Sequence, residues 1–111
     1  MVQLLQLSDY VSNKKGKPIY FGRQDLIKMM GIYAGQVARG VWRDYALDHT
    51  PERAIFSVFK RAQEAPLFEV TKYKSKHGMR YALTSRHRQI KSSKSLEEVL
   101  EALKEVLFQP S

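Results

Sequence analysis

The chain has 111 residues, enough for one domain with a single hydrophobic core. Hydrophobic residues make up 43% and charged residues 27%, the balance of a folded protein, and the absence of cysteine excludes disulfides, thiolate catalysis and cysteine-bound metal clusters. The formal charge of +8 lies in one stretch, because residues 72–94 hold eight basic residues and no acidic one, while the two signs balance elsewhere.

Residues 1–18 are predicted to form a short strand and a flexible N-terminal segment, ahead of a single domain over residues 19–111. Residues 1–7 are apolar but lack a basic flank and a small-residue cleavage site, so we expect no signal peptide. Residues 12–18 (SNKKGKP) are rich in turn formers. No run is long enough to span a membrane, and we expect a cytoplasmic protein without a membrane partner.

A first helix is predicted over residues 22–39 from apolar residues spaced by three or four. Asp25 in its first turn suits the helix dipole, and Gly40 is a plausible C-terminal cap. The expected buried stripe comprises Leu26, Met30, Tyr33 and Val37, widened by Ile27 and Ala34.

Gly31 and Gly35 lie inside this helix, where each costs about 1 kcal/mol relative to alanine. Two interpretations account for them. The favoured one is close packing of the helix onto a sheet, and the other is the approach of a ligand or partner backbone.

Residues 41–90 change to short β-rich runs separated by turn residues, which predicts an antiparallel meander. Four strands are expected over residues 42–48, 54–60, 67–73 and 79–84, with a shorter fifth over 88–90.

A second helix begins at Ser95, with Glu98 three residues later in a capping-box pattern, and stops before Pro110. The resulting fold class is α+β, with two layers: a four- or five-stranded antiparallel sheet and an N-terminal and a C-terminal helix on one face. We expect this helix to bury Leu96, Val99, Leu100, Leu103, Val106 and Leu107.

Two helices can cover only one face of such a sheet. Strand alternation places Trp42 on the face opposite Tyr45, and it leaves Ile55 with Phe59, or else Phe56, for another use. That use could be a homodimer, a protein partner or stacked bases, unless residues 2–19 fold over the face instead.

Catalytic patterns are weak, and an enzyme is the least favoured class. Asp44 and Asp48 lie about 13 Å apart along a strand, too far for a catalytic carboxylate pair. The histidines show no metal-ligand spacing, and no phosphate loop or nucleophile elbow is present. We therefore predict no catalytic residue, no metal and no cofactor. The polar group to inspect is Arg43, Asp44 and His49.

The basic stretch combines cationic and aromatic side chains, which together suit nucleic acid. Tyr73 and Tyr81, with Trp42, are the expected stacking groups. A basic edge that serves only solubility explains the same residues equally well. The expected phosphate contacts are Lys72, Lys74, Lys76, Arg80, Arg86 and Arg88.

The sequence resembles an uncharacterised domain family of small alphaproteobacterial proteins. Trp-Arg-Asp-Tyr-Ala-Leu-Asp at 42–48 and Phe-Ser-Val-Phe at 56–59 carry the resemblance most specifically, within a match over about residues 19–108. It implies a bacterial cytoplasmic protein and no particular activity. Residues 70–84 depart from the family pattern, so a role built on them need not be shared by the family.

Two functions follow as hypotheses. The first is a non-enzymatic binding module that contacts nucleic acid through residues 72–94. The second is a protein-interaction or homodimerisation module that uses the apolar sheet face around Trp42, Ile55 and Phe59.

Overall fold

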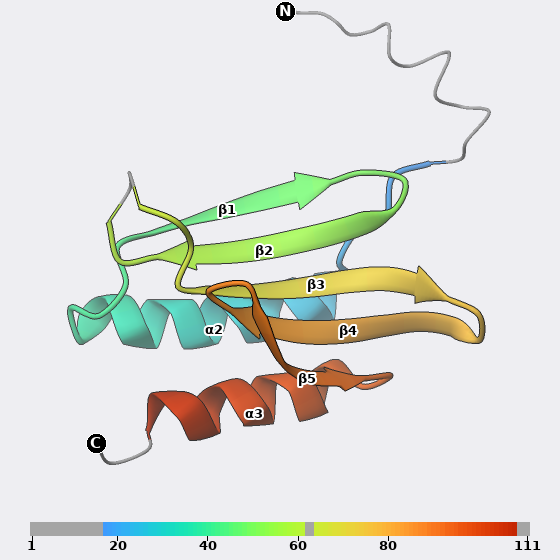
Figure 1. The fold of residues 1–111 in the computed structure, drawn as a ribbon. Coiled ribbons are helices and arrows are strands. Elements are labelled where there is room, and N and C mark those ends of the chain that lie inside the picture. The colour runs from blue at the N-terminus through green and yellow to red at the C-terminus, as the bar shows by residue number, and fades with distance from the viewer. Residues whose placement is uncertain (1–16, 62–63, 109–111) are drawn as a thin grey trace, which may run out of the picture.

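The computed structural model describes residues 17–61 and 64–108, and the predicted strand over residues 1–7 lies outside them. The strands form one antiparallel sheet in the order β1-β2-β3-β4-β5, which confirms the meander (Figure 1). In chain order the elements are α2 (Arg23–Ala38), β1 (Asp44–His49), β2 (Arg53–Phe59), β3 (Phe68–Ser75), β4 (Gly78–Ser85), β5 (Arg88–Ser93) and α3 (Leu96–Leu107).

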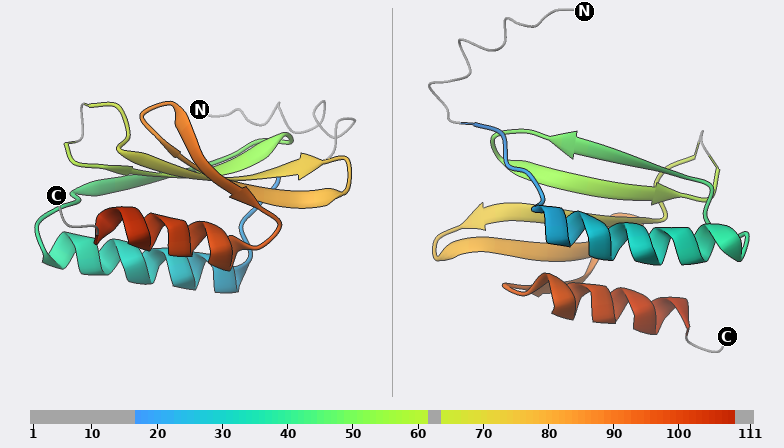
Figure 2. Two further views of the ribbon diagram at one scale, coloured as in Figure 1. Left: turned by 60° about the horizontal axis from the view of Figure 1, so that its bottom comes forward. Right: turned by 180° about the vertical axis from the view of Figure 1, so that it is seen from behind.

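Both helices lie side by side on one face of the sheet, which confirms the two-layer α+β class (Figure 2). They run parallel, because each begins at the end of the sheet where β3 turns into β4 (Figure 1). In the part of the chain that the structure describes, no helix covers the opposite face of the sheet. We call this the uncovered face.

Helix α2 ends as its sequence predicts. The Gly40 N–H donates to the Val37 carbonyl and the Val41 N–H to the Gln36 carbonyl, each over 2.9 Å, which is a Schellman motif. Gly40 has a φ of 77°, a backbone conformation that glycine adopts without strain.

The buried stripe of α2 differs in part from the prediction. Leu26, Met30 and Tyr33 pack against the core as predicted. The fully buried residues are instead Met29 and Gln36, while Ile27 and Val37 are exposed. Small residues lie on several sides of this helix, so its sequence shows no clear apolar face. The pattern therefore does not determine which side of the helix packs on the sheet. The close-packing interpretation of the glycines is also wrong, because a β-carbon at Gly31 or Gly35 would meet nothing within 4 Å.

Helix α3 follows its predicted pattern closely. Ser95 caps it, its hydroxyl accepting a hydrogen bond from the Glu98 N–H over 3.4 Å. The Glu98 carboxylate does not close the expected box, because it accepts a hydrogen bond from the Ser93 hydroxyl instead. The buried residues of α3 are Leu96, Val99, Leu100 and Leu103, while Val106 is exposed.

Trp42 corrects the prediction about the sheet. It precedes β1, so strand alternation does not place it, and it is buried in the core with 2% of its surface exposed. Its ring lies 6.2 Å from that of Tyr33 and 6.3 Å from that of Phe68, measured between centroids. Trp42 is therefore unavailable for stacking on bases or for contact with a partner.

Candidate nucleic-acid interface

The β3–β4 hairpin divides the predicted basic site between the two faces of the sheet. Ser75 pairs with Gly78 across a two-residue turn, so Tyr73 pairs with Arg80 and Lys72 pairs with Tyr81. Paired residues share a face and successive residues alternate. Tyr73 and Arg80 consequently lie on the uncovered face, whereas Lys72 and Tyr81 lie on the face that the helices cover.

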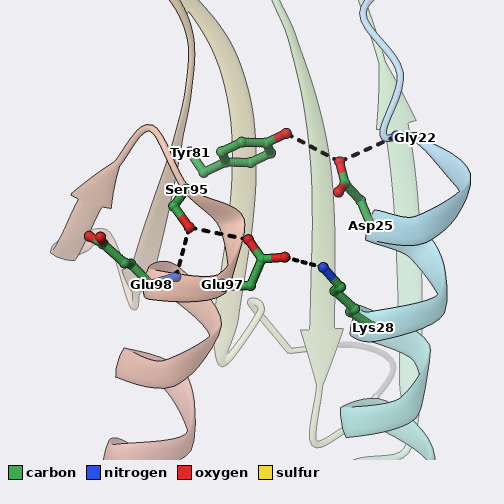
Figure 3. A network of polar contacts seen from close by, with 7 residues as sticks. All are labelled: Gly22, Asp25, Lys28, Tyr81, Ser95, Glu97 and Glu98. Carbon is green, nitrogen blue, oxygen red and sulfur yellow. Dashed lines mark hydrogen bonds and ion pairs between the residues drawn. The ribbon is translucent and has the colours of Figure 1, made fainter.

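The covered half of the hairpin is tied to α2. The Tyr81 hydroxyl donates to the Asp25 carboxylate over 3.2 Å, and this carboxylate also accepts a hydrogen bond from the Gly22 N–H over 3.3 Å (Figure 3). Burial and the nearby Asp25 charge raise the pKa of Tyr81 to about 12. The Lys72 ammonium donates to the Tyr20 carbonyl over 2.8 Å. Tyr81 and Lys72 thus hold the domain together and do not form a stacking surface.

The same network joins the first turns of the two helices. Lys28 of α2 forms an ion pair with Glu97 of α3, and the Ser95 hydroxyl donates to Glu97 over 3.2 Å (Figure 3). The Lys28 hydrogen bond is the main cause of a lowered Glu97 pKa. This exposed cluster links the two helices to each other, and its groups are all engaged with one another.

Tyr73 lies in an unusual orientation on the uncovered face. Its hydroxyl shares a hydrogen bond with that of Ser92 over 3.1 Å, although Tyr73 is on β3 and Ser92 on β5. Neighbouring strands are about 4.8 Å apart, so the ring must extend across β4 to reach Ser92. Ala82 of β4, the partner of Ser92 in the sheet, is only 5% exposed. The phenol ring therefore lies across the strands, with its outer side toward solvent.

Two arginines flank this ring. Tyr73 pairs with Arg53 on β2 and with Arg80 on β4, which places all three residues in one row of the uncovered face. The Arg80 guanidinium also donates to the Ser92 hydroxyl over 3.3 Å. Hydrogen bonding with Ser92, followed by the effects of Arg80, lowers the pKa of Tyr73. The row combines an aromatic surface with positive charge.

The remaining basic residues lie at opposite ends of the sheet. Lys74 and Lys76 are exposed at the β3–β4 turn, while Arg86 and Arg88 are exposed at the β4–β5 turn. Arg80 and Arg86 are six strand residues apart, or roughly 20 Å. The basic residues are therefore spread from the β3–β4 turn to the β4–β5 turn, and they do not form the single patch that the sequence suggested.

The β4–β5 turn is also strained. Arg86 and His87 have φ values of 50° and 72°. These lie in the left-handed backbone region, which residues other than glycine seldom adopt. Arg86 and Arg88 at this turn line a hollow with Val106 of α3, so they lie on the helix side of the sheet.

The half of the uncovered face over β1 and β2 has a different character. Asp44 and Asp48 are exposed there, with Ile55 and Phe59 half-buried beside them on β2. Ile55 and Phe59 thus lie where the sequence placed them, but without Trp42. The cationic and aromatic row ends at Arg53.

The polar group inspected as a catalytic candidate does not assemble. Asp44 and His49 are the first and last residues of β1 and lie on opposite faces. The His49 ring stacks on Tyr20 with centroids 4.5 Å apart, and the Asp44 carboxylate accepts a hydrogen bond from the Tyr45 N–H over 2.8 Å. Arg43 is exposed beyond the strand.

Arg53 and Ser92 are members of the candidate site that sequence reasoning missed. Arg53 lies outside the basic stretch, and Ser92 looks like an ordinary polar strand residue. The register that puts Arg53 beside Tyr73 depends on the connection between β2 and β3, and Tyr73 reaches Ser92 only across β4, so no local sequence pattern reveals either contact. The two-residue turn at Lys76 and His77 was the one local signal that could have separated the faces of the hairpin.

Among residues 17–61 and 64–108, no three histidine or acidic side chains gather as a metal-binding group. Within the same ranges, no helix is long and apolar enough to cross a membrane.

Comparison with known proteins gives one match. The family model described as "Protein of unknown function (DUF2794)" matches residues 19–100, a range that includes the β3–β4 hairpin. No curated protein and no solved structure matches the chain significantly.

Proposed function

The chain belongs to the DUF2794 family of proteins of unknown function, and we propose that it is a non-enzymatic binding module for nucleic acid. The binding surface is the uncovered face over β3 and β4. The observation that carries the proposal is the Tyr73 ring, which lies across β4 with Arg53 and Arg80 in the same row.

The chemistry of this row fits a nucleic-acid strand. A base can stack on the outer side of the Tyr73 ring, because every base has a π face. Arg53 and Arg80 are placed to meet phosphates on either side of Tyr73, and Lys76 adds charge at the β3–β4 turn. Lys74 and Arg88 are not part of this surface, because alternation puts them on the covered face, and Arg86 lines a hollow with Val106 of α3.

The proposal favours single-stranded over double-stranded nucleic acid. Stacking on an aromatic platform needs a base that is free of its own stack, which a single strand offers. The setting that we propose is the cytoplasm of a bacterium.

Fluorescence anisotropy of labelled single- and double-stranded DNA and RNA tests the proposal. We expect single strands to bind, and the affinity to fall steeply as salt rises, because basic side chains displace counterions from phosphates. The double variant Arg53→Glu/Arg80→Glu should lose this binding, because both side chains lie beside Tyr73 on the uncovered face. Absence of binding at low salt, or binding that is independent of salt, would refute the proposal.

A protein-interaction or homodimerisation module is the second candidate. It is favoured by Ile55 and Phe59, two half-buried apolar residues on the uncovered face over β2. Without Trp42 the apolar area is smaller than the sequence suggested. Sedimentation of Phe59→Gln beside the unchanged chain tests this candidate, which predicts that the substitution weakens association.

A further inference from the structure

The acidic strand residues of the uncovered face lie away from the cationic row, which comprises Arg53, Tyr73 and Arg80 and which we call the Tyr73 row. Glu69 is on the same face of β3, but it lies four residues before Tyr73, or roughly 13 Å away. Asp44 and Asp48 are on β1, outside the row. A phosphate backbone laid along the β3–β4 hairpin would therefore pass Glu69. A backbone laid across the strands over the Tyr73 row meets no acidic residue of the described strands.

The register of the strands also limits how many cations one nucleic-acid strand can meet on this face. It places Arg80 on the uncovered face but puts four of the eight basic residues of 72–94 on the covered face, namely Lys72, Lys74, Arg88 and Lys91. Arg86 and Lys94 lie outside the strands, so the register assigns neither to the uncovered face. Arg53 joins Arg80 from outside the basic stretch, and Lys76 lies at the nearby β3–β4 turn. The strands and this turn thus bring two or three cations to the Tyr73 row.

The Tyr73 ring lies along a line that crosses the strands. Its α-carbon is on β3 and its hydroxyl meets Ser92 on β5, with β4 between them. The Arg80 guanidinium donates to the same Ser92 hydroxyl, so it lies at the hydroxyl end of the ring. Arg53 is on β2, at the other end. A base stacked on the ring therefore has one arginine on each side, in a direction that runs across the sheet.

We infer that the uncovered face takes a short unpaired segment of nucleic acid, which crosses the strands over the Tyr73 row. One base stacks on Tyr73, and the phosphates on its two sides meet Arg53 and Arg80. The contact covers about three nucleotides, in place of the longer track that a stretch of eight basic residues suggests. This inference rests on the proposed function and narrows its ligand to short single-stranded stretches, such as ends and small loops.

The salt dependence of binding measures how many phosphates the site neutralises. For single strands, the logarithm of the affinity falls with the logarithm of the salt concentration, with a slope of about −0.7 for each phosphate contact. Two or three contacts predict a slope of about −1.4 to −2.1, whereas contacts from all eight basic residues of 72–94 predict about −5.6. We expect the smaller slope in anisotropy titrations of a labelled oligothymidylate with the full chain.

Substitutions by glutamine assign the individual contacts. Arg53→Gln and Arg80→Gln each remove one cation from the Tyr73 row, so each should lower the affinity about fivefold at about 0.1 M salt and make the slope shallower by about 0.7. Arg88→Gln and Lys91→Gln are the matched controls, because each removes one positive charge from the covered face. Both controls should keep the slope and the affinity of the unchanged chain.

The length of the oligothymidylate gives an independent readout. The affinity should level off beyond about four nucleotides, apart from the small gain that a longer strand derives from offering more binding positions. A slope near −5.6, an affinity that keeps rising severalfold with each added nucleotide, or equal losses in Arg88→Gln and Arg53→Gln would overturn this inference while leaving the proposed function intact. Absence of binding by the unchanged chain at low salt would instead refute the proposed function, and this inference with it.

Discussion

Tyr73 and Tyr81 belong to the same hairpin but lie on opposite faces of the sheet. The Tyr73 hydroxyl meets that of Ser92 over 3.1 Å on the uncovered face, whereas the Tyr81 hydroxyl donates to Asp25 over 3.2 Å beneath the helices. This separation gives the two tyrosines different roles: Tyr73 is proposed for binding, and Tyr81 braces the fold.

Removal of the Tyr73 ring should weaken binding to single-stranded nucleic acid. Stacking of a base on an aromatic ring contributes about 1–3 kcal/mol, so Tyr73→Ala should lower the affinity by roughly 5- to 150-fold. Anisotropy titrations measure the loss. Tyr20→Ala is the matched control, because Tyr20 is 57% exposed but lies elsewhere, and it should bind normally. Equal losses in both variants would rule out a specific role for Tyr73.

Loss of the Tyr81 hydroxyl should affect stability but not binding. Tyr81→Phe removes the hydrogen bond to Asp25 and should lower the free energy of unfolding by about 1 kcal/mol. Urea denaturation measures this change, while anisotropy should give an unchanged affinity. A variant that folds normally but fails to bind would instead assign Tyr81 to the interface.

The two tyrosines should also titrate differently. The pKa of Tyr81 is raised from the usual 10 to about 12 in the folded protein. The neutral Tyr81 side chain therefore stabilises the fold fully below pH 10, and this stabilisation is lost as the pH rises through 12. The pKa of Tyr73 is lowered instead, and Ser92→Ala should move it back toward 10. Ultraviolet titration of Tyr73→Phe, Tyr81→Phe and Ser92→Ala assigns each step. A Tyr81 that ionises before Tyr73 would contradict the structure.

Truncation of Trp42 should damage the core. Trp42→Ala should lower the free energy of unfolding by about 3–5 kcal/mol, since the ring is buried between the helices and the sheet. Trp42→Phe should cost much less, because the indole Nε1 is buried without a hydrogen-bond partner in the described structure and its removal leaves nothing unpaired. Urea denaturation compares the two. A fully tolerated Trp42→Ala would place the ring outside the core.

The sequence allowed prediction of the strands, both helices and the Ser95 cap, because local periodicity and turn residues determine these features. It did not predict the burial of Trp42, since that residue lies outside β1 and alternation does not reach it. The rotation of α2 was missed because Gly31, Ala34 and Gly35 blur its apolar side. The Arg53–Tyr73–Arg80 row depends on the register between β2 and β3, which composition cannot reveal.

Methyl NMR with a single-stranded oligonucleotide tests most directly which surface binds. Thr71, Ala82 and Thr84 present methyl groups on the uncovered face, and Ile27 presents its own in the helix layer. The account predicts salt-sensitive shifts at Thr71, Ala82 and Thr84, with Ala82 responding through the ring of Tyr73, and none at Ile27. Shifts confined to Ile27 and its neighbours, or none at saturating oligonucleotide, would contradict the assignment of nucleic-acid binding to the uncovered face.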